Sequence, residues 1–255
     1  MKKTKGNVIS ITSGNGGVGK TVFATNLCGV YASLKKKVLL IDLDLTSGGV
    51  SVLLNLQKAK TIYNLADDIF NNRFDNSREY VYQYDEYIGV IPSCKDPRQG
   101  SKIDSKLIEQ IVNIYKNSYD VIIIDTSHVP TSSTLASLDI ASTILFMITD
   151  NPVSLKNASN MLEILKNVGK DAKVILNLSY RNEKAYFSKF DIKSIIGHNI
   201  DYILPQSMYI TNINKYIMEG KILVLNNKLS FKNNSDRDLL IKIANKLIEG
   251  EQDEK

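Results

Sequence analysis

The clearest chemistry in the sequence lies in a glycine-rich segment near the N-terminus. The segment fits the pattern G-x-x-x-x-G-K-[ST] and reads Gly14-Asn15-Gly16-Gly17-Val18-Gly19-Lys20-Thr21. Glycines let successive backbone N–H groups turn inward around phosphate oxygens without Cβ clashes. The amino group of Lys20 can reach the β- and γ-phosphates of a nucleotide, and the Thr21 hydroxyl can coordinate Mg²⁺. The segment therefore predicts a nucleotide site, with a chance glycine loop as the alternative.

The residues on either side of this segment predict the strand and the helix that a phosphate loop requires. Residues 8–12 form a short β-branched run, and residues 20–34 form an amphipathic stretch of helical length. A helix that begins near Lys20 points the positive end of its dipole at the same anion. This context favours a phosphate loop over a chance run of glycines.

Three aspartates follow two further predicted strands. Asp125 comes directly after residues 121–124, and Asp42 and Asp44 come after residues 38–41. The carboxyl ends of parallel strands meet at one edge of a sheet, so these carboxylates are placed to hold Mg²⁺ and its water shell. A capping or surface role is the alternative for any one of them. Three carboxylates at the same edge favour the metal–nucleotide interpretation.

Short β-branched runs alternate with longer helical stretches from one end of the chain to the other. Most of the runs are apolar on both faces, as parallel strands are when helices cover each side of the sheet. The predicted strands are residues 8–12, 38–41, 88–91, 121–124, 144–148, 174–178 and 202–204, and the predicted helices are residues 20–34, 105–117, 153–168, 210–218 and 235–249. The alternation predicts an α/β fold with one doubly wound, mostly parallel sheet and helices on both faces, in a single domain over residues 1–255.

The composition excludes several classes of protein. Of 255 residues, 43% are hydrophobic and 23% are charged, as in a globular chain and unlike a disordered one. No apolar run approaches the ~18 residues of a membrane-spanning helix, and the N-terminus lacks the apolar core of a signal peptide. The two cysteines make neither a disulfide framework nor a zinc site. We expect a cytoplasmic protein, whose net charge of +5 permits weak attraction to nucleic acid or an anionic membrane without requiring it.

A polar stretch, residues 71–87, contains four closely spaced tyrosines at positions 80, 82, 84 and 87. Exposed tyrosines can stack on nucleic-acid bases. Tyrosine alternating at period two is more typical of an edge strand or hairpin, which is the structure we expect here.

The glycine-rich segment resembles the deviant Walker A loop of the ParA/MinD ATPases, whose pattern is K-G-G-x-G-K-[ST]. The resemblance covers nearly the whole chain, through residues 38–44, residues 119–126, Ile175-Leu176-Asn177 and Ile203-Leu204-Pro205. Within this group the sequence looks most like the CpaE/TadZ branch, because of Asp42-Leu43-Asp44-Leu45, Ile91-Pro92-Ser93 and Ser154-Leu155-Lys156-Asn157-Ala158. That branch serves the assembly and polar placement of Tad-type (Flp) pili and related secretion machines.

The resemblance implies a role for each matching residue. It implies that ATP or ADP is held by Gly14, Asn15, Gly16, Gly17, Val18, Gly19, Lys20, Thr21 and Val22. Asn177 matches an asparagine that reads adenine, and the segment after Pro205 matches the other wall of the base pocket. Mg²⁺ is expected on Thr21 and Asp125, with Asp42 beside its water shell. In catalysis, Lys20 is expected to contact phosphate and Asp44 to position the attacking water, next to Asp42.

The family's subunits sandwich two ATP molecules face to face, so the resemblance implies a homodimer that forms on ATP binding. The dimer binds a partner, and hydrolysis releases it. In the CpaE/TadZ branch the expected partner is a protein of the pilus or secretion machinery. The protein is then cytoplasmic and is recruited to the cell pole or the inner membrane surface.

Two positions depart from the family pattern. The signature Lys, which reaches across the dimer to the partner's phosphates, is Asn15 here. A cation on a transferring phosphoryl group can be worth ~10³–10⁵ in rate, so we expect slow hydrolysis with nucleotide binding retained. After Asp125 the usual Pro-rich turn is replaced by Thr126-Ser127-His128-Val129-Pro130. His128 can assist proton transfer at this place, although a lone loop histidine is more often structural.

Two other functions fit the same superfamily. A ParA-type DNA-partition ATPase needs a basic face, and the tight basic cluster in this sequence is Lys35-Lys36-Lys37 at a predicted helix–strand turn. A MinD-like membrane-cycling ATPase needs an anchor, and residues 239–248 form an amphipathic stretch. An acidic tail follows that stretch, so we expect it to pack on the domain and membrane association to be indirect or weak.

Overall fold

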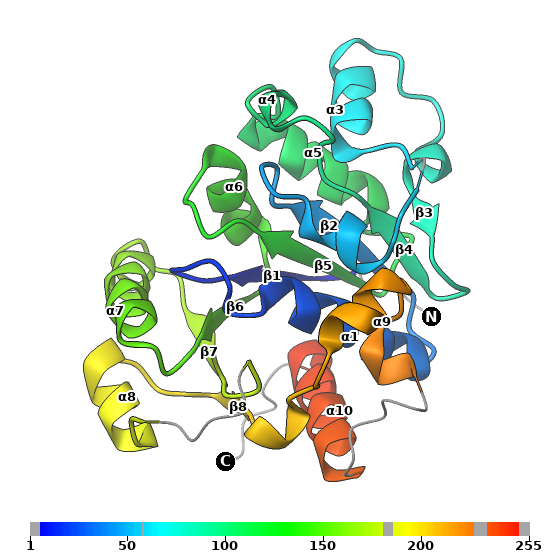
Figure 1. The fold of residues 1–255 in the computed structure, drawn as a ribbon. Helices are drawn as coiled ribbons and strands as arrows, with labels where there is room; N and C mark the ends of the chain where they lie inside the picture. The colour runs from blue at the N-terminus through cyan, green and yellow to red at the C-terminus, as the bar shows by residue number, and fades with distance from the viewer. Residues whose placement is uncertain (1–5, 58, 181–185, 227–233, 250–255) are drawn as a thin grey trace.

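The computed structural model describes residues 6–57, 59–180, 186–226 and 234–249. Its centre is a sheet in the order β3-β4-β2-β5-β1-β6-β7-β8 (Figure 1). Every neighbouring pair is parallel except β3 and β4. The strands are β1 Asn7–Thr12, β2 Val38–Leu43, β3 Tyr82–Gln83, β4 Ile88–Ile91, β5 Val121–Thr126, β6 Thr143–Ile148, β7 Ala172–Asn177 and β8 Tyr202–Leu204. The predicted doubly wound, mostly parallel α/β fold is confirmed.

Helices cover both faces of this sheet (Figure 1). They are α1 Lys20–Ser33, α2 Gly49–Leu53, α3 Ile62–Phe70, α4 Pro97–Gly100, α5 Ser105–Tyr115, α6 Ser132–Ile140, α7 Pro152–Asn167, α8 Lys189–Ile196, α9 Ile213–Met218 and α10 Asn234–Glu249, with 3-10 turns η1 Ser77–Tyr80, η2 Gln206–Met208 and η3 Leu223–Leu225. Side chains of a strand alternate between the two faces. Ile9 of β1 accordingly packs with α1 and α10, whereas Val8 packs on the opposite face with α5.

The last helix, α10, lies alongside α1 and belongs to the core (Figure 1). Ile243 and Ala244 are fully buried, and Leu240 and Leu247 nearly so. The hydroxyl of Tyr31, on α1, donates a hydrogen bond to the Ala244 carbonyl at 3.0 Å. The prediction that this stretch packs on the domain is confirmed.

The structure contains short helices that were not predicted, each of nine residues or fewer: α2, α3, α4, α6 and α8. In α6 the buried residues include Ser133, Thr134 and Ser137 beside Ala136 and Leu138, so the helix has no continuous apolar stripe. Helix α9 starts at Ile213 and not at residue 210, because Asn212 adopts a left-handed conformation with φ of 58°. The tyrosine-rich stretch forms the predicted edge strand, since Tyr82 in β3 pairs antiparallel with Val90 in β4.

Within the described ranges, the structure contains no helix that is long and apolar enough to span a membrane.

Substitution of Ile243 by Ala tests whether α10 is a core element. The change leaves a cavity beside α1, so we expect the free energy of unfolding to fall by about 2–5 kcal/mol. Urea unfolding followed by circular dichroism measures the change, with Lys242→Ala on the exposed face of the same helix as the control. Equal stability of the two variants contradicts the packing described for α10.

Candidate nucleotide-binding site

The glycine-rich loop joins β1 to α1 at the carboxyl edge of the sheet. Gly17 and Gly19 have φ values of 75° and 95°, a conformation that L-residues with side chains rarely adopt. Gly19 is the N-cap of α1 and supplies no capping side chain. The first N–H groups of α1 therefore remain available to an anion at the positive end of the helix dipole.

Lys20 is buried at the foot of this loop. Its ammonium group donates a hydrogen bond to the hydroxyl of Ser13 at 2.8 Å, and that hydroxyl donates to the Asn15 carbonyl at 2.6 Å. Burial lowers the pKa of Lys20, while the carboxylates of Asp125 and Asp44 act in the opposite direction. Ser13 was not predicted as a site residue, although a hydroxyl directly before the glycines is the local signal for such a contact.

Asp42 and Asp125 face each other at the ends of two paired strands. The parallel register of β2 and β5 sets Asp42 beside Asp125. Asp42 is fully buried and accepts hydrogen bonds from the backbone N–H of Asp44 at 3.0 Å and of Val50 at 3.1 Å. Burial, and next the charge of Asp125, raise the pKa of Asp42 well above its usual value. Asp42 thus holds the start of α2 in place.

Asp125 is buried with neither carboxylate oxygen hydrogen-bonded within the described residues. Burial raises the pKa of Asp125 to about 6, although the nearby Thr21 hydroxyl and Lys20 ammonium favour the charged form. A buried carboxylate without full hydrogen bonding is unfavourable unless a cation compensates it. Carboxylate and hydroxyl oxygens are ligands that Mg²⁺ prefers. The residues present therefore fit a divalent cation between Thr21 and Asp125.

Asp44 and the start of α2 close the same region. The Asp44 carboxylate accepts from the Thr46 hydroxyl at 2.9 Å and the Ser47 N–H at 3.1 Å, which folds the segment into a turn. A Cβ atom on Gly49 would lie 3.3 Å from the Thr21 hydroxyl oxygen. Helix α2 thus begins directly against the predicted metal ligand.

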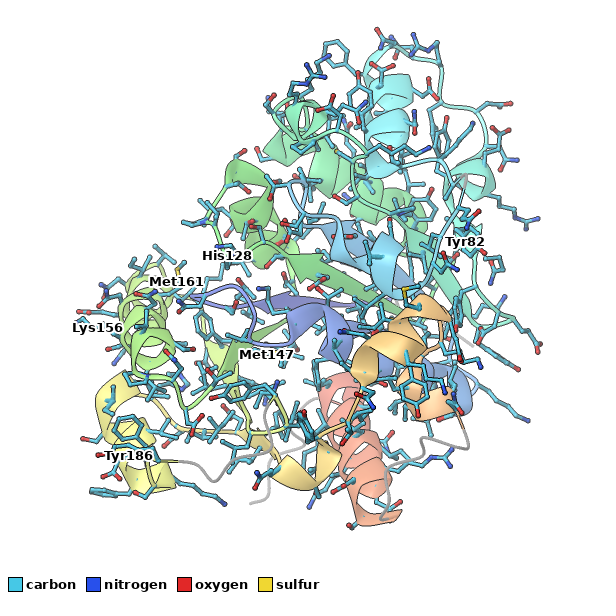
Figure 2. All side chains as sticks on the ribbon, viewed as in Figure 1. Tyr82, His128, Met147, Lys156, Met161 and Tyr186 are labelled. Carbon is cyan, nitrogen blue, oxygen red and sulfur yellow. The ribbon has the colours of Figure 1, made fainter. Side chains whose placement is uncertain are left out.

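His128 lies beside the glycine-rich loop, on the connection between β5 and α6 (Figure 2). Its ring atoms are 3.6 Å from where a Cβ atom on Gly16 would stand. Asn15, in the same loop, has a buried side-chain oxygen without a hydrogen-bond partner among the described residues. The structure thus brings His128 to the loop, at the place where the sequence predicted it, without assigning it a chemical role.

A cavity of about 210 Å³ opens between the loop and the chain segments after β7 and β8. Asn177, at the end of β7, lines it, and so does Val22 of α1. Pro205 itself is not one of the described residues that line the cavity; the residues after it are. The lining residues are Gly19, Val22, Phe23, Asn26, Asn177, Ser179, Tyr180, Leu204, Met208, Tyr209, Ile210, Ile213, Leu223 and Leu240.

The chain segment after Pro205, which lines the cavity, is hydrogen-bonded to the last helix, α10. The hydroxyl of Ser207 donates to a carboxylate oxygen of Asp236 at 2.9 Å, and Met208 and Leu240 then face the cavity. Sequence reasoning missed Ser179, Asn26 and this contribution of α10, since none belongs to a short motif.

The remaining titratable candidates are His198 and the two cysteines, of which Cys94 lies near Asp42. The His198 ring is hydrogen-bonded to the Asn199 carbonyl at 2.9 Å and lies 3.6 Å from Asp171. Cys28 is buried in α1, where burial raises the pKa of its thiol. Burial raises the pKa of the Cys94 thiol to about 11. The described ranges contain no group of three or more His, Cys, Asp or Glu side chains arranged around a metal position.

A family model described as an AAA domain, AAA_31, matches residues 6–178. A putative septum site-determining protein MinD of Emiliania huxleyi is 28% identical over 228 residues, which are 88% of this chain and 82% of that protein. An ATP-binding protein of Methanocaldococcus jannaschii is 29% identical over 162 residues, which are 64% of this chain and 60% of that protein's length.

Solved structures share the fold. The ParA family ATPase of Chlorobium tepidum superimposes with a TM-score of 0.79 at 19% identity, covering 93% of this chain and 98% of that one. The septum site-determining protein MinD of Pyrococcus horikoshii, complexed with Mg-ADP, superimposes with a TM-score of 0.75 at 20% identity, covering 98% and 99%.

Substitution of Asp125 by Asn tests the electrostatics of the buried carboxylate. Its raised pKa means that the folded protein binds a proton more tightly than the unfolded chain does, so the free energy of unfolding falls as pH rises from about 4 through about 6. The amide of the variant carries no charge at any of these pH values. We expect Asp125→Asn to be about 1–3 kcal/mol more stable than the nucleotide-free wild type at pH 7.5, with little difference at pH 4.

Urea unfolding at the two pH values measures this difference, and Asp75→Asn at an exposed position is the control. Addition of Mg²⁺ and ATP is expected to raise the melting temperature of the wild type more than that of Asp125→Asn, which lacks the carboxylate that fits the cation. A variant that is no more stable than the wild type at pH 7.5 contradicts the unpartnered state of Asp125.

Proposed function

Because the chain belongs to the AAA_31 family and is a P-loop ATPase of the ParA/MinD superfamily, we propose that it is a nucleotide-gated switch that positions another cellular assembly. The observation that carries this proposal is the juxtaposition of the buried Lys20 with the unpartnered Asp125 below an open glycine loop. Such a pair fits a phosphate group together with a divalent cation.

Each part of the site has a proposed task. The backbone N–H groups of residues 14–22 and the ammonium of Lys20 bind the phosphates of ATP or ADP. Thr21 and Asp125 hold Mg²⁺, with Asp42 beside its water shell, and Asp44 positions the attacking water. The bound Mg²⁺ supplies positive charge to the phosphate oxygens. The base lies in the cavity that Asn177 and the segment after Pro205 line.

We propose slow hydrolysis, because Asn15 supplies no charge where the family has a Lys. The loop is open on its outer side, where Gly16 and Gly17 are exposed, and Val129 and Leu135 nearby expose about half of their surface. This surface suits the approach of a second copy. The nucleotide then controls the dimer, and the dimer presents a surface to a partner.

The finer proposal is that the partner belongs to a Tad/Flp-type pilus or secretion machine, with recruitment to the cell pole or the inner membrane surface. It rests on the CpaE/TadZ-like segments around Asp42-Leu43-Asp44-Leu45 and Ser154-Leu155-Lys156-Asn157-Ala158. The relatives named above include MinD and ParA proteins, which supports placement of a cellular structure more broadly.

The effect of the missing Lys is testable by substituting Asn15 with Lys. We expect wild type to dimerise with Mg²⁺-ATP and to release phosphate slowly, and Asn15→Lys to release it at least about tenfold faster, because the added cation stabilises charge on the transferring phosphoryl group. Light scattering after size exclusion and phosphate release are measured on the same samples.

Asn15→Gln is the matched control, since it changes length but adds no charge, and Lys20→Ala is expected to remove nucleotide binding. If the wild type hydrolyses ATP rapidly and Asn15→Lys has the same rate, the proposal that Asn15 makes hydrolysis slow is refuted. ATP binding without any change in self-association refutes the nucleotide-gated dimer.

Binding to DNA and to membranes separates the alternatives. We expect no ATP-dependent retention on duplex DNA or on anionic vesicles, because the apolar face of α10 is in the core and Lys35-Lys36-Lys37 is a short cluster at the α1–β2 turn. Gel shifts and vesicle co-sedimentation measure this. Salt-sensitive, ATP-dependent DNA binding would favour a partition ATPase, and vesicle binding would favour a membrane-cycling one.

A further inference from the structure

The side chain of Asn177 has a fixed orientation at the mouth of the cavity. Its Nδ2 donates a hydrogen bond to the Val18 carbonyl at 2.9 Å. Its Oδ1 accepts from the backbone N–H of Ser179 at 2.9 Å and from the Ser179 hydroxyl at 2.7 Å. A carbonyl can only accept and a backbone N–H can only donate, so a flipped amide would lose the bonds to the Val18 carbonyl and to the Ser179 backbone N–H.

These contacts use most of the amide's hydrogen-bonding capacity. The two lone pairs of Oδ1 are both occupied by Ser179, whereas Nδ2 carries two N–H groups and gives one to Val18. A Cβ atom on Gly19 would lie 2.7 Å from Nδ2, which places this nitrogen directly over the start of α1. Asn177 can therefore donate one more hydrogen bond toward the cavity and accept none.

Other polar side chains that line the cavity are also engaged in bonds within the protein. Asn26 accepts from the Val224 N–H at 2.9 Å and donates to the Val22 carbonyl at 2.7 Å. The Tyr180 hydroxyl donates to Asp150 at 2.6 Å. Much of the remaining lining is apolar. The Asn177 N–H is thus well placed to set how a base is oriented.

We propose that Ser179 is a positioning residue for recognition of the base. It holds the Asn177 amide so that Asn177 offers an N–H donor, and no acceptor, to a ring nitrogen of a purine. The inference rests on the proposed function, since it requires a nucleotide base in the cavity. Asn177 then makes no bond with the 6-amino group of adenine. The same amide also ties the base pocket to the phosphate loop through Val18.

Binding of ATP and of inorganic tripolyphosphate to Ser179→Ala tests this role by calorimetry. The variant retains only the backbone N–H on Oδ1, so we expect ATP to bind about fivefold more weakly, while tripolyphosphate, which has no base, binds as to wild type. Ser179→Thr keeps the hydroxyl and is expected to restore ATP affinity. Ser188→Ala, at the N-cap of α8 outside the cavity, is the matched control.

Unchanged ATP affinity in Ser179→Ala overturns the role of Ser179. An equal loss for ATP and tripolyphosphate also overturns it, since the defect then lies in the phosphate loop. A wild type that binds tripolyphosphate as tightly as ATP shows that the base is not held in this cavity. A wild type that binds neither overturns the proposed function as well, so the two failures are distinguishable.

A second arm tests the hydrogen-bond direction with purine riboside triphosphate, which lacks the 6-amino group. The affinity ratio of ATP to this analogue is expected to be the same in wild type and in Asn177→Ala, because Asn177 cannot accept from that group. A ratio that collapses toward one in Asn177→Ala means that Asn177 does accept from the amino group, which overturns the proposal.

Discussion

Lys20 and Asp125 are buried next to each other without a direct ion pair within the described residues, and this electrostatic constraint governs the site around them. Lys20 is held by the Ser13 hydroxyl, and the oxygens of Asp125 are without hydrogen bonds. Both groups are removed from water, where a charge is well solvated. The strands and helices around the two groups are extensively packed. A site of this kind is incomplete without a charged ligand, and the nucleotide-dependent switch proposed above rests on that physical basis.

The sheet produces this constraint through its register. Strand β1 lies between β5 and β6, in the middle of the sheet, where the strand order reverses. At such a reversal a crevice forms at the carboxyl edge of the sheet, and the loop after β1 lies there. The pairing of β2 with β5 aligns Asp42 with Asp125, and a slip of one residue would point one of them to the other face of the sheet. Asp42 uses its acceptors on the backbone N–H groups of Asp44 and Val50, which leaves Asp125 as the carboxylate open to a cation.

A structural feature was predictable where the residues that specify it lie close together in the sequence. The buried strands and the glycine loop were predictable, because β-branched runs and the spacing from Gly14 to Thr21 are contained in short windows. Helix α6 was not, since its buried face mixes Ser and Thr with Ala136 and Leu138 and lacks an apolar period. The role proposed for Ser179 depends on Asn177, whose amide also makes a contact across the fold to Val18. The base wall likewise depends on Leu240, which is distant in the chain from Asn177.

The packing of α10 on α1 has a consequence for biosynthesis. Helix α1 completes the phosphate loop near the beginning of the chain, yet the helix that buries its flank and closes one side of the base cavity is made near the end. Until the residues of α10 have been translated, Tyr31 has no Ala244 carbonyl to bind, even after all the strands of the sheet have been made. A nascent chain therefore acquires the α10 side of its ligand cavity only after α10 has left the exit tunnel.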